Sequence, residues 1–465
     1  MSTKCPSGST APGIARRGVH LDLKGLPPTP DRLLSLVLVF NAAGYNCILV
    51  EWEDTFPWTV DPRFRCETAY TADVIRQFHA EAGRLGMEVI PLVQCLGHME
   101  TPLSLPAYAH MREIAHMPDV MNVLAPGARD LVRRMVDDVL SLTPGARYLH
   151  LGGDEAWSFG LHPDTAAYVA EHGKGALYLQ HIEPILDSLN ARGVRPILWH
   201  DMMRGWDATA LQRIAGKADL MVWGYNGVPA PTDTHHGSGV MERFASQGIA
   251  LWGATAYKGC DGMDSDRPVP AERGENALAW VDLAKRFSMQ GVVATAWSRW
   301  TTLYFQTDPI DGALDAAFLV GAILTTGKAP DGGTDACREM LASIGELQRF
   351  DACCMALNDL SRHREANWKA IRLLRQLAIT STQDVRKRPA TALRHWYGVL
   401  RAGIRQIEAA GAAVREAFDG LVDPVWIQRY CDERILPFRQ EADAVEPVVR
   451  ETDPDGYVAI QEGRA

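Results

Sequence analysis

The chain has 465 residues, of which 47% are hydrophobic and 22% charged, an ordinary composition for a globular protein with a large core. Its formal net charge of −10 and its scattered Lys and Arg residues argue against nucleic acid as a partner, because phosphate binding needs a concentrated basic surface. The longest apolar stretch, residues 33–43, is too short to cross a bilayer, so no membrane partner is expected.

Residues 1–14 are expected to be disordered, because they are rich in Ser, Pro, Thr and Gly. They also lack the apolar segment of a secretion signal. The nine cysteines are odd in number, widely spaced and free of CxxC pairs, which argues against both a disulfide framework and a zinc site. Reduced thiols without a secretion signal indicate a cytoplasmic protein.

Residues 15–330 alternate short β-rich runs with longer helical patterns such as 71–85 and 127–142, which predicts βα units around a parallel sheet. Eight candidate strands occur at 18–23, 46–51, 88–94, 148–153, 195–200, 220–224, 249–253 and 291–297. Eight such units predict a (β/α)8 TIM barrel as the catalytic domain. A doubly wound open sheet is the alternative, but no GxGxxG run follows the first strand.

Residues 331–465 are expected to form a helical C-terminal region. The Gly-rich link 331–334 marks its start, and long amphipathic patterns follow at 391–418 and 426–449. Residues 453–465 are expected to be frayed. Because this region could either cover the barrel or pair two copies of the chain, the protein is expected to be a monomer or a homodimer.

Polar and aromatic residues gather where the predicted strands end, and the active site of a barrel lies at that face. These residues are His20, Asp22, Glu51, Glu53, Asp54, His98, Asp154, Glu155, Trp199, His200, Asp201, Trp223, Tyr225, Trp252, Trp297 and Arg299. Together they predict a pocket with carboxylates at its base and aromatic walls, which suits a small glycoside or the end of a glycan. The sequence shows no phosphate-binding loop that would indicate a nucleotide site.

The run HLGGDE at 150–155 ends the predicted fourth strand and resembles the H-x-G-G-D-E signature of family 20 glycoside hydrolases. The segments VHLDLKG (19–25), EWEDTFPW (51–58), LWHDM (198–202) and AWSRW (296–300) are similar to its hexosaminidase D-like branch. The resemblance spans the predicted barrel. It implies an exo-acting β-N-acetylhexosaminidase that removes terminal β-linked N-acetylgalactosamine or N-acetylglucosamine without a cofactor or a metal.

The resemblance also implies substrate-assisted retaining hydrolysis, in which the 2-acetamido oxygen of the substrate attacks the anomeric carbon. Glu155 would match the general acid and base. Asp154 would match the residue that orients the acetamido group and stabilises the charge that develops on it. Tyr225 would match a hydrogen-bond partner of the acetamido oxygen, and His98 with Asp54 would match a His–Asp pair that buffers the proton of the acid.

The resemblance assigns further substrate-binding positions. Trp199, Trp223, Trp252 and Trp297 are candidates for the pocket walls, with Trp223 and Trp297 best placed. Many relatives carry an arginine after the first strand and Trp-x-Glu on the last, whereas this chain has His20 and Asp22 at the first and Trp297-Ser298-Arg299 at the last. The hexosaminidase D-like branch shares both departures, and the resemblance to it leans towards acceptance of galactosamine.

Three other functions stay open at this stage. A metal-dependent barrel hydrolase would use His20, His98, His200 and Asp201, although the first strand reads His-Leu-Asp rather than His-x-His. A retaining β-glycosidase with an enzyme nucleophile would pair Glu155 with Glu51 or Glu53. A non-catalytic sugar-binding barrel would bind the ligand without turnover.

Overall fold

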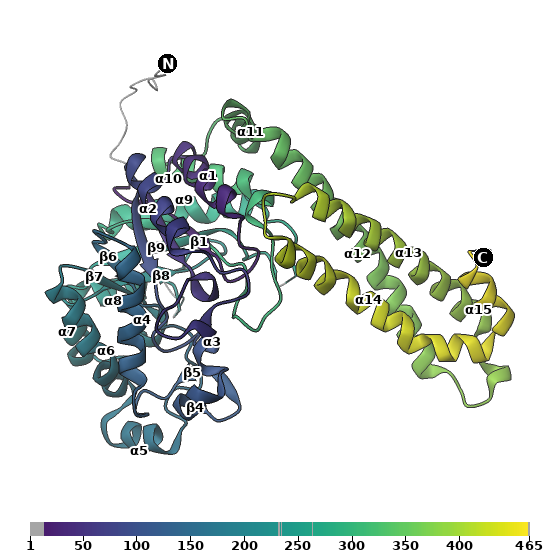
Figure 1. The fold of residues 1–465 in the computed structure, drawn as a ribbon, viewed down its shortest axis with the longest axis horizontal. Helices are drawn as coiled ribbons and strands as arrows, with labels where there is room; N and C mark the ends of the chain where they lie inside the picture. Colours follow the sequence, from purple (N-terminus) through teal and green to yellow (C-terminus); the bar gives the residue numbers. More distant parts are fainter. Residues whose placement is uncertain (1–13, 231–232, 234, 263, 464–465) are drawn as a thin grey trace.

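The computed structural model describes residues 14–230, 233, 235–262 and 264–463. Eight parallel strands close into a barrel in the order β1-β10-β9-β8-β7-β6-β3-β2 (Figure 1). These strands are β1 (Arg17–Asp22), β2 (Cys47–Glu51), β3 (Glu88–Leu92), β6 (Tyr148–His150), β7 (Arg195–Trp199), β8 (Asp219–Trp223), β9 (Leu251–Lys258) and β10 (Val292–Ala296). The TIM-barrel prediction is therefore confirmed, and each predicted strand has an observed counterpart.

Helices surround the barrel and contribute apolar side chains to its core. They are α1 (Pro30–Ala42), α2 (Ala72–Arg84), α3 (Glu100–Leu103), α4 (Ala128–Leu142), α5 (Pro163–His172), α6 (Lys174–Ala191), α7 (Ala208–Ile214), α8 (Ser238–Ser246), α9 (Pro270–Arg286) and α10 (Leu314–Thr326). Local sequence signals set several helix starts. For example, the Thr71 side chain accepts the Val74 N–H and caps α2.

The predicted seventh strand is correct in existence but wrong in extent. It was expected to end at Gly253, whereas β9 continues to Lys258 and stays buried throughout. Trp252 therefore lies at the start of the strand, where its indole N–H donates to Asp219 Oδ2 at 3.0 Å. The residues around Lys258, at the carboxyl end of β9, lie at the face of the barrel where active sites are found.

A short antiparallel hairpin, β4 (Arg112–Ile114) and β5 (Met117–Met121), was not predicted. It lies in the long connection after β3. The buried Glu113 carboxylate accepts the backbone N–H groups of Gly160, Leu161 and His162. The hairpin thereby fixes the loop after β6 to the loop after β3, and those two loops carry Asp154, Glu155 and His98.

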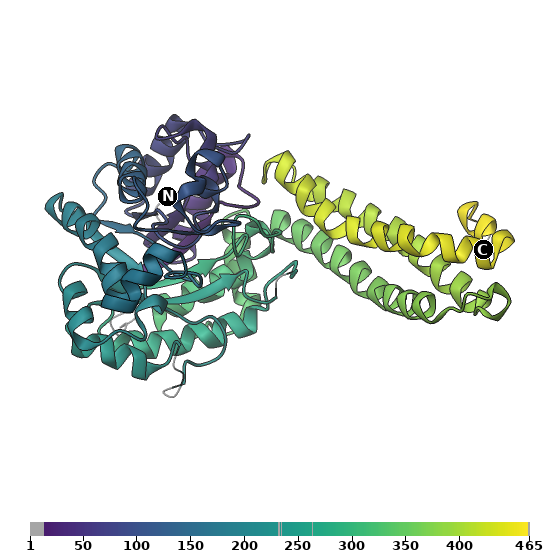
Figure 2. The same ribbon diagram turned by 90° about the horizontal axis from the view of Figure 1, so that it is seen from below.

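The C-terminal region forms a helical arm that extends away from the barrel (Figures 1 and 2). Its helices are α11 (Thr334–Ser343), α12 (Leu347–Thr380), α13 (Ala390–Ala417), α14 (Pro424–Thr452) and α15 (Pro454–Gln461). The long helices α12, α13 and α14 run side by side around an apolar core that includes Leu357, Leu400 and Phe438. Cys337 and Leu341 of α11 instead belong to the barrel core.

The expectation that residues 453–465 are frayed is wrong for the helix α15. Asp453 caps it by accepting the Gly456 N–H at 3.0 Å, and Pro454 occupies its first turn. Ile460 is buried against the core of the arm, and the Tyr457 hydroxyl donates to Glu446 at 2.7 Å. Of the predicted disordered segment, residues 1–13 lie outside the described residues, whereas Ile14 packs in the barrel core.

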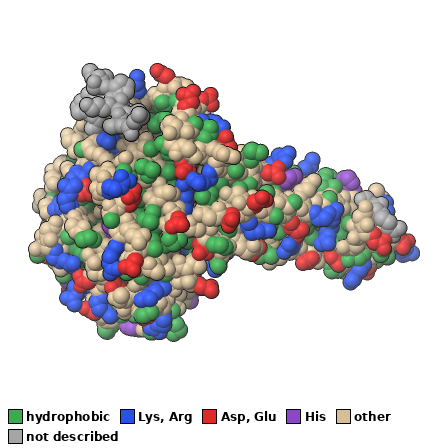
Figure 3. All heavy atoms as spheres, turned by 45° about the horizontal axis from the view of Figure 1, so that its top comes forward, with side chains coloured by type: hydrophobic (Ala, Val, Ile, Leu, Met, Phe, Trp, Pro, Cys, Tyr) green, Lys and Arg blue, Asp and Glu red, His purple; other side chains and the backbone are tan. Residues whose placement is uncertain are grey.

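Acidic and basic side chains are interspersed on the face shown in Figure 3, over both the barrel and the arm. The eight cysteines within the described residues are all free. Across the same part of the chain, no helix combines the length and the apolar character needed to span a membrane.

A buried ion-pair cluster joins the barrel to the base of the arm. Arg32 of α1 lies 2.5 Å from Asp311 and 3.0 Å from Glu346, and all three side chains are largely shielded from solvent. We expect Arg32→Met to lower the free energy of unfolding by about 3–5 kcal/mol, because it leaves the buried Asp311 carboxylate without its cation, whereas Glu346 keeps its pair with Arg349. The exposed pair of Arg76 with Asp73 provides the control. Arg76→Met should cost less than about 1 kcal/mol in urea denaturation, and equal losses in the two variants would contradict the assignment.

Candidate active site

A cavity of about 300 Å³ opens at the carboxyl ends of the barrel strands. Its lining comprises His98, Asp154, Glu155, Trp223, Tyr225, Asn226, Gly259, Cys260, Gly262, Trp297 and Trp300. The volume lies at the small end of the range for ligand sites, which suits a single sugar ring rather than a long chain. The wall combines two carboxylates and an imidazole with four aromatic rings.

The turn after β6 explains why the sequence reads Gly152-Gly153-Asp154-Glu155. Both glycines have positive φ angles, 58° and 82°. A Cβ atom on Gly152 would lie 1.8 Å from Gln94 Oε1, and one on Gly153 would lie 2.3 Å from the Tyr178 hydroxyl. Glycine is favoured at both positions, so the chain can turn tightly and deliver the following carboxylates to the cavity.

Asp154 and Glu155 leave the turn in different environments. The Asp154 side chain is 9% exposed and the Glu155 side chain 38% exposed. Glu155 itself has a φ of 46°, a left-handed conformation that a non-glycine residue adopts at a cost on the order of 1–3 kcal/mol. Its backbone N–H donates to Asp201 Oδ2 at 2.9 Å, which holds this conformation. The buried carboxylate and the accessible one can therefore perform different tasks.

His98 reaches both carboxylates from the loop after β3. Its Nε2 lies 3.5 Å from Asp154 Oδ2 and 3.6 Å from Glu155 Oε2. Burial opposes the charged imidazole, but the Asp154 and Glu155 carboxylates outweigh it and hold the pKa of His98 well above its usual value. The loop approaches so closely that a Cβ on Gly97 would lie 2.0 Å from the Asp154 carbonyl oxygen. His98 therefore supplies positive charge between two negative groups.

The aromatic wall is built from the loops after β8 and β10. Trp223 and Tyr225 stack with ring centroids 5.3 Å apart and an angle of 17° between their planes. Tyr225 also lies 6.1 Å from Trp297, at 58°. Flat aromatic faces bind the apolar faces of a sugar ring, and the Tyr225 hydroxyl can donate to an oxygen of the substrate.

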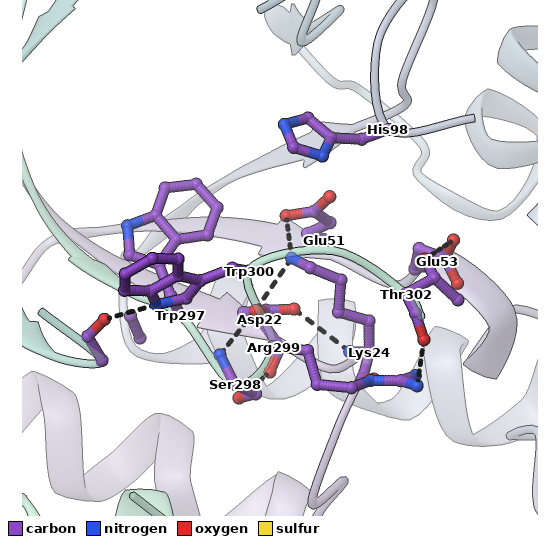
Figure 4. A network of polar contacts seen from close by, with 12 residues as sticks. Asp22, Lys24, Glu51, Glu53, His98, Trp297, Ser298, Arg299, Trp300 and Thr302 are labelled. Atoms are coloured by element: carbon purple, nitrogen blue, oxygen red, sulfur yellow. Dashed lines mark hydrogen bonds and ion pairs between the residues drawn. The ribbon is translucent and has the colours of Figure 1, made fainter. Parts of the chain in front are cut away.

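A buried charge network lies beneath Trp297 (Figure 4). Lys24 Nζ is 2.8 Å from Asp22 and 3.1 Å from Glu51, and it sits 5.0 Å from the centre of the Trp297 ring. Burial lowers the pKa of His20 to about 3, so its imidazole is neutral beside Glu51. His20 and Asp22, predicted to bind substrate, lie outside the cavity lining and support Trp297 from below.

Four other predicted site residues lie elsewhere. Trp199 is fully buried, and its ring centroid lies 6.1 Å from that of Trp297. Trp252 lies at the opposite end of its strand from the cavity. Asp54 is not paired with His98, because it lies 3.7 Å from Arg299 Nη2. Arg299 points towards Thr302, as Figure 4 shows, and its guanidinium lies over the ring of Trp426 of the arm. None of these four residues lies in the cavity lining.

Asp201 was missing from the predicted set of site residues for this mechanism. Burial, with the nearby Asp154 charge, raises its pKa to about 7. The signal in the sequence was its position directly after a strand-end tryptophan and histidine. The sequence alone does not show that the Asp201 carboxylate turns back to Glu155. Gly259 and Cys260 were also missed as parts of the cavity lining.

The alternative sites lack geometric support. Glu51 and Glu53 lie outside the cavity lining and share with His98 a separate void of about 20 Å³. Glu51 is engaged by Lys24 and Gln94. No group of three or more His, Cys, Asp or Glu side chains within the described residues is arranged to hold a metal ion.

Comparison with known proteins gives a consistent result. Residues 56–241 match the profile described as glycosyl hydrolase family 20, catalytic domain. The chain is 34% identical to the hexosaminidase D of Homo sapiens over 305 residues, 63% of this chain and 62% of that protein. It is 34% identical to the hexosaminidase D of Bos taurus over 295 residues, 61% of this chain and 84% of that protein. The chitobiase of Flavobacterium johnsoniae shares the fold, with a TM-score of 0.54 and 15% identity over 97% of this chain and 72% of that one.

We expect Asp201→Asn to become more stable relative to the wild type as the pH rises. The pKa of Asp201 is raised in the folded protein, so the carboxylate is penalised once it ionises, whereas Asn still accepts the Glu155 N–H and does not ionise. The difference in unfolding free energy should grow by roughly 1.4 kcal/mol between pH 6 and pH 8. Thermal unfolding at a series of pH values measures it, and a constant difference would contradict the assignment.

Proposed function

This chain belongs to glycosyl hydrolase family 20, and from that premise we propose that it is an exo-acting β-N-acetylhexosaminidase that uses substrate-assisted retaining catalysis. The substrates would be glycosides or glycan ends that carry a terminal β-linked N-acetylgalactosamine or N-acetylglucosamine. The observation that carries the proposal is the convergence of Asp154, Glu155 and His98 on one small cavity walled by Trp223, Tyr225 and Trp297.

The first half of the reaction needs an acid and an internal nucleophile. Glu155, the more exposed carboxyl, donates its proton to the glycosidic oxygen as the bond from that oxygen to the anomeric carbon breaks. The 2-acetamido oxygen of the substrate forms the new bond to the same carbon, which gives an oxazolinium-like intermediate. No enzyme carboxylate has to attack, so Glu51 and Glu53 are not needed as nucleophiles.

Asp154 and Tyr225 would orient the acetamido group for this attack. The buried Asp154 carboxylate accepts the acetamido N–H and stabilises the positive charge that develops on the ring being formed. The Tyr225 hydroxyl donates to the acetamido oxygen. Burial raises the pKa of this hydroxyl well above its ordinary value, so it stays protonated as a donor.

The second half returns the enzyme to its starting state. Water attacks the anomeric carbon, and the Glu155 carboxylate takes the proton from that water as the bond to the acetamido oxygen breaks. Attack from the face that the aglycone left restores the β-configuration. The protonated His98 imidazole lies 3.6 Å from Glu155, where it balances the negative charge that the carboxylate carries between the two steps.

The test compares nitrophenyl β-N-acetylglucosaminide and β-N-acetylgalactosaminide with the plain β-glucoside. We expect turnover of the acetamido sugars alone and inhibition by a thiazoline mimic of the intermediate. Glu155→Gln should lower kcat/KM by about 10²–10⁴-fold, and Asp154→Asn by about 10²–10³-fold, because each removes an interaction made in the transition state. The preferred acetamido sugar shows how the 4-hydroxyl is recognised.

Asp219→Asn is a matched control, since Asp219 is also a buried barrel carboxylate but bonds Arg195 and Trp252 at the other end of the strands. It should keep the turnover of each folded molecule. Equal turnover of the plain glucoside would contradict the proposal and indicate a retaining mechanism with an enzyme carboxylate as the nucleophile. Binding of the thiazoline without turnover of any substrate would favour a sugar-binding protein.

A further inference from the structure

The loops after β9 and β10 form one continuous wall of the cavity. Gly259, Cys260 and Gly262 come from the first loop, and Trp297 and Trp300 from the second. The two loops are tightly bonded to each other. The Gly259 N–H donates to Asp308 at 3.0 Å, and the Trp300 indole donates to the Gly259 carbonyl oxygen at 3.3 Å. A Cβ on Gly259 would lie 2.2 Å from the Trp297 carbonyl oxygen, so the two loops are in close backbone contact.

The helical arm is bonded to the loop after β9 through Asp266. This buried carboxylate accepts Arg364 of α12 at 2.7 Å and Tyr430 of α14 at 2.6 Å, and it also pairs with Arg434 of α14. The Arg434 guanidinium in turn lies 3.5 Å from the centre of the Tyr430 ring. One residue of the wall loop therefore joins two helices of the arm in a site shielded from water, where ionic contacts are strong.

The second loop is held by the same helix, α14. The Gln306 backbone N–H donates to Glu433 at 2.9 Å, and its side chain donates to the Trp426 carbonyl oxygen at 3.3 Å. Arg299, between Trp297 and Trp300 in sequence, lies 4.9 Å from the Trp426 ring. The arm is thus connected to both edges of the wall within a few residues of the cavity lining.

The groups proposed to carry the chemistry come from the other half of the barrel. His98, Asp154, Glu155 and Tyr225 follow β3, β6 and β8, and those strands are contiguous with β7 in the closed sheet. The strands whose loops contact the arm, β9, β10, β1 and β2, are contiguous as well. The Thr29 N–H, after β1, donates to the Leu421 carbonyl oxygen, and Thr68, after β2, accepts from the Trp426 indole.

We propose that the helical arm acts as a clamp, which holds the cavity wall formed by Trp297 and Trp300 in position against the sugar. Asp266 is the positioning residue, because its carboxylate bonds the wall loop to α12 and α14. The inference rests on the proposed function for its substrate. Loosening the clamp should weaken the fit of the ring in both the ground state and the transition state. It should leave the proton transfers by Glu155 unchanged, so KM should rise while kcat holds.

The test is Asp266→Asn in the full chain, with Asp264→Asn as the matched control. Asp264 lies in the same loop and faces the same Arg364 at 3.2 Å, but its side chain is 67% exposed. We expect Asp266→Asn to raise KM for the preferred nitrophenyl substrate about 10-fold with kcat within about 2-fold, and Asp264→Asn to match the wild type. Tyr430→Phe removes a single bond to Asp266 and should shift KM in the same direction, which keeps the test available if the charge variant does not fold.

A second measurement needs no substrate. Cys260 lines the cavity in the clamped loop, and the rate at which iodoacetamide alkylates it can be followed on its own peptide by mass spectrometry. Asp266→Asn should speed this alkylation relative to Asp264→Asn. Wild-type KM together with a wild-type alkylation rate in folded Asp266→Asn would overturn the clamp, as would a fall in kcat at constant KM. Faster alkylation in a protein that hydrolyses no acetamido sugar would support the clamp while refuting the proposed function.

Discussion

The turn from Gly152 to Glu155 is the constraint on which the active site depends. Two consecutive carboxylates must leave a buried strand in different directions, and this requires backbone conformations that side chains rarely adopt. The surrounding structure imposes them through contacts on every side: Gln94 and Tyr178 against the glycines, Gly97 against the Asp154 carbonyl, and the Asp201 carboxylate on the Glu155 N–H. The strain is local, and the segments after β3 and β7 together with helix α6 hold it in place.

Electrostatic balance is the second requirement. Removing water from so many carboxylates would protonate them unless cations compensate, and the barrel supplies these in separate layers. Lys24 lies between Asp22 and Glu51 beside Trp297, whereas His98 lies between Asp154 and Glu155 at the cavity itself. Asp201 has no such cation, and burial together with the Asp154 charge raises its pKa to about 7. The Asp201 carboxyl can therefore hold a proton near neutral pH while it accepts the Glu155 N–H.

Sequence patterns predicted the barrel and the tight turn before Asp154 and Glu155 because both depend on local signals. Alternating βα periodicity identifies the strands, and a double glycine before two acids marks a tight turn at a strand end. The misplaced residues depended on information that is not local. Trp252 was placed at the wrong end because the strand boundary was set five residues too early. Asp54 was paired with His98 and Arg299 was assigned to the sugar, because nothing in their own segments shows that Arg299 lies beside Asp54 and turns towards Trp426, a residue of the distant arm.

The closed barrel divides into two sets of contiguous strands. The loops of one set carry the acid residues, and the loops of the other set contact the helical arm. The segment that matches the family profile, residues 56–241, contains β3, β6, β7 and β8, whose loops deliver the carboxylates, the imidazole and the stacked Trp223–Tyr225 pair. The opposite wall follows β9 and β10 and lies outside that segment, where it is bonded to the arm rather than to the acid residues. Chemistry needs one fixed geometry, whereas the fit of a particular glycoside depends on the wall that faces it. Holding that wall by a separate helical element lets the fit vary without disturbing the strained turn that carries Asp154 and Glu155.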